Sequence, residues 1–274
     1  MTSSLNSIFP FRFLIIAVTA LSLGACATAP DSSDPEAVAE FDQVNDPAEP
    51  TMRAIFAFNR TLDTVVLKPA ASVYKDVVPD KGRAAVHNFL NNLRTPVIFF
   101  NNVMQGDFED ALMTLMRFLI NSTVGILGFD DVAADLGMEF RNEDFGQTLA
   151  VWNMPDGPYI MLPVFGPSNP RDAIGRVVDF IIDPLNIWAG NVDNDWAMPT
   201  RTGVDAVDFR ALHFDTIADL EKSSLDFYAT VRTLYRQRRN DEIHNGNVDP
   251  AMSVPSIGEL LDDGPAVEEI SQAD

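Results

Sequence analysis

Apolar residues recur every three or four positions along most of the chain between residues 45 and 240. The strongest stripe falls within 108–122, and Gly125 and Gly128 follow it as terminators. The same spacing predicts longer helices at 46–67, 171–188 and 215–238, and shorter ones at 80–93 and 96–105.

The first predicted helix has end signals of its own. Asp46 can cap its N-terminus, Pro47 suits the first helical turn, and Glu49 is placed to complete a capping box. Lys68-Pro69 is expected to end it.

Strand-like alternation is scarce by comparison. The one apolar extended run is Tyr159–Phe165, and Pro163 within it is unfavourable in a central strand. The chain also contains 18 prolines and 15 glycines, which favour many interrupted helices over a few long ones. We therefore predict a mostly α-helical fold.

The N-terminus has the pattern of a bacterial export signal. After Arg12 comes the apolar run Phe13–Leu23, which is shorter than the ~20 residues of a membrane span but suits a signal peptide. The only cysteine follows in Leu23-Gly24-Ala25-Cys26, which resembles a lipobox. We predict a diacylglycerol and an N-acyl chain on Cys26, since two or more acyl chains anchor a protein stably. Ala27, directly after the cysteine, favours the outer membrane as the destination of the protein. The alternative is an ordinary signal peptide in which Cys26 is not modified.

Acidic residues outnumber basic ones by 40 to 19, which gives a formal net charge of -21. The imbalance is concentrated in two arms, because 27–50 and 241–274 contain no Lys or Arg. The predicted organisation is a signal peptide at 1–25, an acidic flexible tether at 26–44, a helical domain at 45–240 and an acidic, disordered tail at 241–274. A negative field of this size repels nucleic acid, so we predict no nucleic-acid partner.

The chain lacks the residue patterns of common catalytic, metal and nucleotide sites. None of the histidines, His87, His213 and His244, stands in a paired metal-ligand spacing. No GxSxG elbow, P-loop or GxGxxG motif is present. Asp193-Asn194-Asp195 hints at a calcium loop, but a turn is favoured because the rest of the EF-hand pattern is missing. We therefore predict no metal, no cofactor besides the acyl chains on Cys26, and no enzymatic activity.

Two features bear on lipid contact. Val97–Phe100 and Ile126–Phe129 place large apolar groups beside polar breaks, and the chain has 19 Phe against 4 Tyr. Any one of these residues is better explained by core packing, but together they favour a body partly inserted in a membrane. The second feature is a group of arginines near a predicted helix end: Arg232, Arg236, Arg238 and Arg239. They either complement the helix dipole or contact anionic headgroups.

Many ordered blocks of the sequence, over roughly 45–240, resemble the VacJ/MlaA lipoprotein family. They include Asn45-Asp46-Pro47-Ala48-Glu49-Pro50, Phe56-Ala57-Phe58-Asn59-Arg60, Arg117–Gly125, Asp144–Leu149, Gly166-Pro167-Ser168 and Asp183-Pro184-Leu185-Asn186. One departure is Trp152–Asp156, where family members have a Gly-rich approach to Gly157-Pro158-Tyr159.

The resemblance implies an all-α fold: a ring-like bundle of several long and many short amphipathic helices around a central channel, embedded in one membrane leaflet. It implies a lipid-anchored protein on the periplasmic side of the outer membrane. The implied partners are phospholipids, a trimeric porin and a soluble periplasmic shuttle. The implied function is to remove mislocalised phospholipids from the outer leaflet and pass them to the shuttle.

Glycines and prolines gather beside apolar runs at two places in the predicted helical domain. Gly125 and Gly128, with the loop from Gly157 to Gly166, are therefore predicted to form the gate or hinge of the channel. Two other functions stay open. A structural lipoprotein that scaffolds porins would conduct no lipid, and a phospholipase would need a nucleophile that the sequence does not supply.

Overall fold

The computed structural model of the chain describes residues 45–194 and 196–246. The predicted signal peptide, Cys26, the 26–44 tether and the tail beyond 246 lie outside the described residues. The elements in chain order are α3 (Glu49–Leu62), η1 (Asp63–Leu67), α4 (Lys68–Val77), α5 (Asp80–Gln105), α6 (Phe108–Thr123), α7 (Val132–Asp135), α8 (Phe145–Val151), β1 (Ile160–Leu162), β2 (Gly166–Ser168), α9 (Pro170–Ile182), α10 (Pro184–Asn191), α11 (Ala197–Leu212), α12 (Phe214–Ser223) and α13 (Phe227–Ile243). The predicted, mostly helical fold is confirmed.

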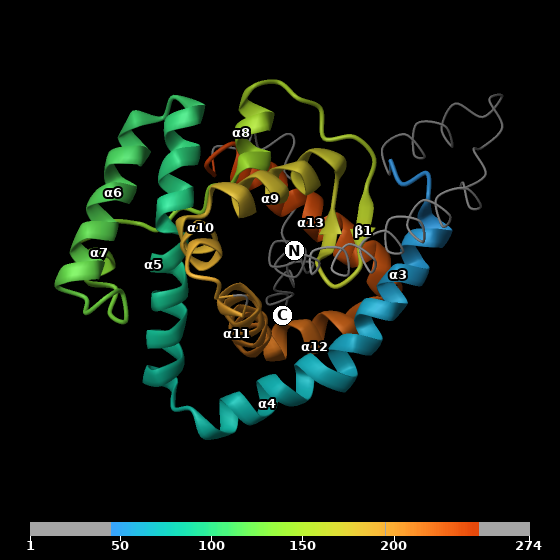
Figure 1. Cartoon of the computed structure of the whole chain (residues 1–274). Helices are drawn as coiled ribbons and strands as arrows, with labels where there is room; N and C mark the ends of the chain where they lie inside the picture. Colours follow the sequence, from blue (N-terminus) through green and yellow to red (C-terminus); the bar gives the residue numbers. More distant parts are fainter. Residues whose placement is uncertain (1–44, 195, 247–274) are drawn as a thin grey trace, which may run out of the picture.

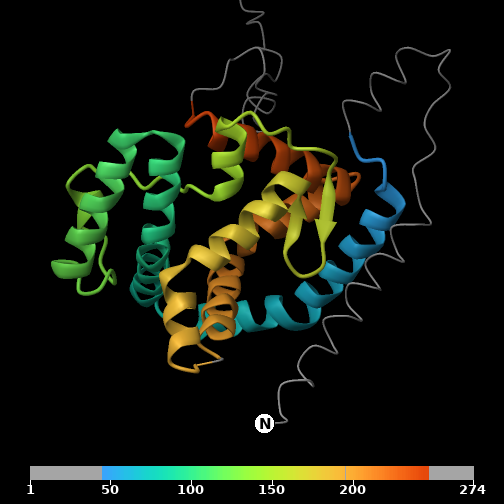
Figure 2. The ribbon, with the colours of Figure 1, turned by 45° about the horizontal axis from the view of Figure 1, so that its top comes forward.

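The helices follow the outline of the molecule (Figure 1). α3 and α4 form one arc at the lower right, α5 and α6 lie side by side at the left, and α8 and α9 cross the top. Figure 2 places the β-hairpin between α9 and α3, with α10 at the other end of α9. A channel through the middle stays a prediction, because an outline of helices does not define an open path.

The first helical segment continues beyond its predicted end. α3 passes through the π-helical turn η1 into α4, and Pro69 lies in the first turn of α4. The π turn shifts the hydrogen-bond register just before this proline, so the chain stays helical. The prediction that Asp46 caps α3 is also wrong. The N-cap position is Ala48, and the Asp46 carboxylate instead accepts hydrogen bonds from Tyr228 and Arg232 of α13.

Two predicted long helices are each divided by an aspartate that caps a new helix. Asp183 accepts from the Leu185 amide at the start of α10, and Asp226 accepts from the Tyr228 amide at the start of α13. Conversely, the two short helices predicted at 80–93 and 96–105 form one helix, α5, which continues through Pro96. No helix of the described residues is long and apolar enough to cross a membrane.

The β-hairpin is packed between α3 and α13. β1 and β2 are antiparallel, with Leu162 paired to Gly166 next to the tip. Tyr159 and Met161, at the base of the hairpin, form a buried cluster with Tyr228 of α13. The rings of Tyr159 and Tyr228 meet edge-on, with their centroids 6.0 Å apart. The hairpin is therefore attached to the helical body at its base, whereas its tip projects beyond this cluster.

Candidate functional site

Among the described residues, many polar side chains are buried and many large apolar side chains are exposed. Twenty polar or charged residues are buried, against 11 hydrophobic ones, whereas 36 large hydrophobic side chains are exposed. Buried polar groups and large exposed apolar areas are the informative departures from ordinary burial. An apolar exterior of this size indicates contact with lipid or with another protein.

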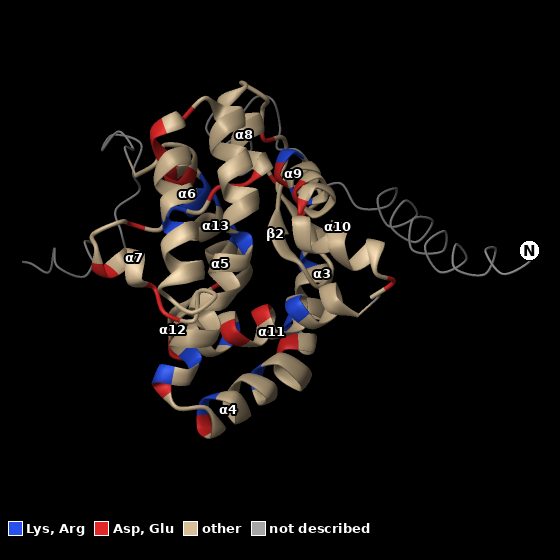
Figure 3. Cartoon of the chain, turned by 60° about the vertical axis from the view of Figure 1, so that its left-hand side comes forward, with Lys and Arg blue, Asp and Glu red and all other residues tan. Residues whose placement is uncertain are grey.

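The longest apolar stretch of the exterior follows α6 and the turn after it. Phe108, Leu112 and Leu119 are 70%, 61% and 49% exposed. The only basic residue of α6, Arg117, is buried and pairs with Asp131 at 2.8 Å. Figure 3 accordingly shows long stretches of α5, α6 and α10 without charged residues.

An apolar cavity of about 670 Å³ lies between the α3–η1 junction, the hairpin tip, α10 and α11. Its walls are formed by Leu62, Val66, Leu67, Val164, Phe180, Asn186, Ala189, Gly190, Asn194, Met198, Pro199, Thr202, Gly203 and Ala206. No charged side chain is among them, and the volume is within the range of small-molecule sites. Burial stabilises hydrocarbon by roughly 0.8 kcal/mol per CH₂, so this cavity suits an acyl chain.

The hairpin tip forms one wall of the apolar cavity and has a strained backbone. Val164 has a φ of +71°, which is unfavourable for a β-branched residue. Asn59 of α3 holds the tip with two hydrogen bonds. Its Nδ2 donates to the Leu162 carbonyl at 2.9 Å, and its Oδ1 accepts from the Val164 amide at 2.8 Å. Arg176 of α9 donates to the Phe165 carbonyl at 3.1 Å, so two helices hold the tip.

The four glycines predicted as a gate lie in two separate places. Gly125 and Gly128 are in the turn between α6 and α7, at the left of Figure 1, whereas Gly157 precedes the hairpin at the right and Gly166 begins its second strand. Only the hairpin borders the apolar cavity, through Val164. The structure therefore does not bring the two pairs together.

The turn that contains Gly125 is tightly packed. A Cβ at Gly125 would lie 2.7 Å from the backbone oxygen of Asn121, and one at Gly128 would collide with Asn92. Gly166, by contrast, has a φ of +78° and nothing within 4 Å of a Cβ. Gly125 and Gly128 therefore allow close packing, whereas Gly166 allows a left-handed backbone conformation that other residues rarely adopt.

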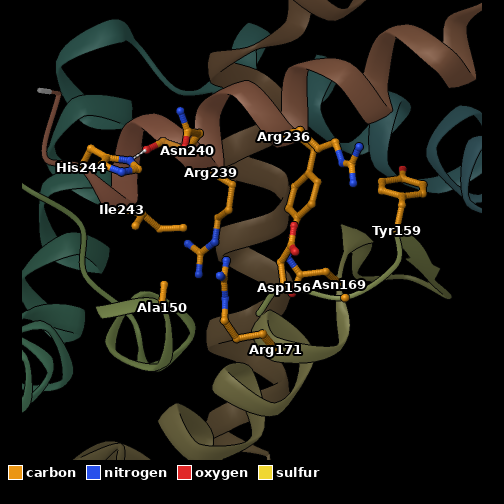
Figure 4. Close-up of a pocket in the computed structure, with 12 residues that line it drawn as sticks. Ala150, Asp156, Tyr159, Asn169, Arg171, Arg236, Arg239, Asn240, Ile243 and His244 are labelled. Carbon is orange, nitrogen blue, oxygen red and sulfur yellow. Dashed lines mark hydrogen bonds between the residues drawn. The ribbon is translucent and has the colours of Figure 1, made fainter. Parts of the chain in front are cut away.

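A second cavity, polar and about 470 Å³ in volume, lies between α8, the start of α9 and the end of α13 (Figure 4). Arg239 of α13 donates to Asp144 at 2.6 Å, to Asp172 at 2.7 Å and to Glu242 at 2.9 Å. Burial, the largest single effect, would raise the pKa of Asp144, but the hydrogen bonds and charge of Arg239 and the hydrogen bonds from Gln147 together outweigh it, so the pKa is lowered. The pair is therefore ionised and connects α8 with α13.

The arginines singled out near the end of α13 are only partly available to solvent. Arg232 pairs with the buried Asp46 at 3.0 Å, and Arg239 forms the ion pairs just described. The side chain of Arg238 is 66% exposed and pairs with Glu242. The interpretation as a headgroup contact is therefore wrong for Arg232 and Arg239, whose guanidinium groups bind carboxylates inside the protein.

Two buried carboxylic acids lie close to this network. Burial, as the largest effect, raises the pKa of Glu143 to about 7 and that of Asp179 to about 6. Gln105 donates to Glu143 at 2.7 Å, and Asp179 accepts from Asn101 at 2.9 Å. These hydrogen bonds only partly offset the loss of solvation, so Glu143 is about half protonated at neutral pH.

The histidines have local partners. His87 Nδ1 lies 2.9 Å from the Asp208 carboxylate. His213 and His244 each form a hydrogen bond with the backbone carbonyl group four residues earlier in the chain. Within residues 45–194 and 196–246, no group of three or more His, Cys, Asp and Glu side chains is arranged to hold a metal ion.

These features define an α-helical protein with a polar interior, an apolar exterior and an apolar cavity. The model of the MlaA lipoprotein family matches residues 44–242. Over 236 residues the chain is 33% identical to the intermembrane phospholipid transport system lipoprotein MlaA of Haemophilus influenzae, covering 84% of this chain and 90% of that protein. The Escherichia coli K12 protein of the same name is 31% identical over 224 residues, 80% and 86% of the two chains.

A solved structure gives the same result. It concerns the structural basis for maintenance of bacterial outer membrane lipid asymmetry, and superposes with a TM-score of 0.65 at 31% identity. The match covers 72% of this chain and 98% of that chain. The chain therefore belongs to the MlaA lipoprotein family.

Proposed function

We propose that this protein is the outer-membrane lipoprotein of an intermembrane phospholipid transport system. It removes mislocalised phospholipids from the outer leaflet through a central channel and passes them to a soluble periplasmic shuttle. The observation that carries the proposal is the apolar cavity beneath the hairpin tip, in a protein whose exterior is itself apolar. The names of the Haemophilus and Escherichia relatives support the same system.

Physical chemistry explains why such a protein is needed. A phospholipid that crosses a bilayer unaided must carry a charged headgroup through hydrocarbon, which is costly. A protein with buried polar groups and an apolar exterior lowers this cost, because headgroup and acyl chains each stay in a compatible environment. The function requires no bond to be made or broken, so we assign the protein no catalytic step.

The proposed anchor is Cys26, with a diacylglycerol and an N-acyl chain that hold the body on the periplasmic side of the outer membrane. A trimeric porin is the proposed neighbour in the membrane, against the apolar face of α6. In the alternative function, a structural porin-associated lipoprotein, this face would be sufficient and the cavity would hold no lipid.

The gate is proposed to be the hairpin tip. Gly157 and Gly166 flank the moving segment, and Asn59 holds it in the observed position. The strained Val164 stores conformational free energy that release of the tip would recover. Gly125 and Gly128 are proposed as a second hinge, next to α6.

The test compares outer-leaflet phospholipid in cells that lack the gene and in complemented cells. We expect raised surface phospholipid without the gene and rescue by the natural chain, but not by Cys26→Ala. Gly203→Phe places a ring in the apolar cavity from a position where a Cβ has nothing within 4 Å, so it should also fail to rescue. Ser223→Phe, at the exposed end of α12, is the matched control.

A second measurement separates transport from scaffolding. Phospholipid that co-purifies with the natural protein should be lost in Gly203→Phe, while the amount of porin bound stays the same. Full rescue by Gly203→Phe would contradict a lipid path through the apolar cavity and would leave the scaffold as the better explanation.

A further inference from the structure

The polar cavity contains a buried cation whose hydrogen-bonding capacity is only partly used. Arg171 is 6% exposed. Its Nε donates to Asp172 at 3.2 Å and its Nη1 to the Met154 carbonyl at 3.5 Å, at the limit of a hydrogen bond. Among the described residues, no hydrogen bond involves Nη2 of Arg171. Figure 4 shows the guanidinium groups of Arg171 and Arg239 pointing toward one another beside Ala150 and Ile243.

The carboxylate of Asp172, next to Arg171, is shared by several donors, although within the described part of the chain its Oδ1 accepts from Arg171 alone. Asp172 accepts from Arg239 at 2.7 Å, from Tyr235 at 2.5 Å and from Asn169 at 3.1 Å. These three donors bind Oδ2, and the 3.2 Å contact of Arg171 with Oδ1 is the longest of the four. Arg239, by contrast, binds Asp144 with two nitrogens at 2.6 Å. Arg171 therefore has no carboxylate of its own, because Asp172 also pairs with Arg239.

We propose that the polar cavity binds a phosphate group, carried by a phospholipid headgroup, with the Nη1 and Nη2 atoms of Arg171 as its direct contacts. Two adjacent guanidinium nitrogens match the spacing of phosphate oxygens, and charge-assisted bonds of this kind are among the strong ones. The proposal rests on the proposed function and adds to it a site for headgroup recognition outside the apolar cavity.

The position of α9 favours a lipid over free phosphate. Its first turn forms a wall of the polar cavity, and Phe180 in its last turn lines the apolar cavity. The nine residue steps from Arg171 to Phe180 span roughly 14 Å, about half the ~30 Å hydrocarbon core of a bilayer. Along α9, Ile174, Val177 and Ile181 are 47%, 58% and 61% exposed. A headgroup at Arg171 thus leaves its acyl chains along an apolar surface.

Asp156 gives the site a preference among headgroups. It is exposed at the edge of the polar cavity and is the only carboxylate in its wall. A carboxylate repels a bare phosphate but attracts an ammonium group next to it. The site should therefore favour phosphoethanolamine over phosphoglycerol, which has no cation to offer.

The test is calorimetric titration of the full-length protein with inorganic phosphate, sn-glycero-3-phosphoethanolamine and sn-glycero-3-phosphoglycerol. We expect saturable binding, tightest for the ethanolamine compound. Arg171→Gln should weaken binding about tenfold or more, since a bond to a charged group is lost. Arg238→Gln, on an exposed side chain of α13, should change it less than about twofold.

Asp156→Asn keeps the proposal testable if Arg171→Gln does not fold. This substitution should tighten the binding of inorganic phosphate and reduce the preference for ethanolamine, and unfolding cannot produce a gain in affinity. No saturable binding by the natural protein would overturn the proposal. So would equal affinity for phosphate and both headgroup compounds, because it would indicate a site for free phosphate.

The outcomes also separate this site from the proposed function. If lipid co-purifies and Gly203→Phe fails to rescue cells, but no headgroup compound binds, the phosphate site is wrong and lipid transport stands. If headgroup compounds bind as expected while outer-leaflet phospholipid is unchanged without the gene, the site stands and transport is wrong.

Discussion

At the scale of single residues, buried charges determine which elements of this protein meet. Arg117, Arg210 and Arg239 are each at most 8% exposed. Each pairs with a carboxylate from another element, at 2.8, 2.7 and 2.6 Å respectively. A buried pair adds little net stability, but the loss of one partner leaves an uncompensated charge in the interior. These pairs therefore specify the arrangement of helices more than they stabilise it.

Arg239→Leu should show this asymmetry most clearly. Removal of the guanidinium leaves Asp144 without a cation and Asp172 with Arg171 alone, so the free energy of unfolding should fall by about 3–5 kcal/mol. Arg238→Leu, one position earlier and exposed, should cost no more than about 1 kcal/mol. Urea denaturation in a fixed detergent measures both. Similar losses for the two variants would mean that the Arg239 network does not hold α8 against α13.

Glu143→Gln should stabilise the protein above neutral pH. The pKa of Glu143 rises from 4.5 in the unfolded chain to about 7 in the folded protein, so the folded state holds its proton more tightly. Stability is therefore lost as pH rises from about 4.5 to about 7, and stays reduced above that range. Glutamine keeps an acceptor for Gln105 but has no charge to bury.

The expected gain is about 1–3 kcal/mol at pH 8, and it should vanish near pH 4.5. Thermal unfolding of both proteins at a series of pH values measures it. Asp219→Asn, at an exposed carboxyl group 3.7 Å from Lys222, is the control and should show no such gain. If the two proteins differed in stability by the same amount at every pH, Glu143 would not be the group whose titration lowers the stability.

At the scale of helices and strands, the sequence predicted those parts that local pattern determines. The stripe within 108–122 corresponds to α6, which ends at Thr123. α11 was not predicted, because its apolar residues are spread around the helix rather than gathered on one face. The π turn η1 and the passage of α5 through Pro96 depend on tertiary packing, which periodicity does not report.

The candidate site was predictable only in outline. Composition and the family resemblance indicated the hairpin region, through Gly157 and Gly166. The bonds that hold the tip join Asn59 to residues more than 100 positions away, so no local pattern reveals them. The contact of Arg171 with the polar cavity was missed for the same reason, because the residues of α13 that form the opposite wall lie more than 60 positions away.

Asn59→Ala should loosen the hairpin tip without unfolding the body. The Val164 amide loses its acceptor and the Leu162 carbonyl its donor, while the packing of Tyr159 and Met161 at the hairpin base is unchanged. Hydrogen exchange at the Val164 amide should accelerate about tenfold, since one hydrogen bond contributes about 1 kcal/mol. Thr61→Ala, whose hydroxyl bonds only within α3, is the control. Equal exchange in both variants would show that Asn59 does not hold the tip.

At the scale of the whole molecule, most of the uncompensated negative charge and the apolar surface lie in different parts of the chain. The formal net charge is -21, yet 27–50 and 241–274 hold acids without a single Lys or Arg. The described body lies between these two arms in the sequence, and it exposes 36 large hydrophobic side chains. An apolar body between two acidic arms is suited to a surface where hydrocarbon meets water, because each part keeps its preferred surroundings.

This distribution predicts that the body binds membranes without its lipid anchor. Cys26→Ala protein should float with phospholipid vesicles, and replacement of Leu112, Met116 and Leu119 of α6 by Gln should lower its partition coefficient at least tenfold. Burial of one large apolar side chain contributes about 1.5–3 kcal/mol, so three partly buried ones are sufficient for this change. The matched control replaces Thr61, Asp219 and Ser223, all exposed and polar, by Gln. If the α6 variant floats as well as the control, the apolar face of α6 does not hold the body on membranes.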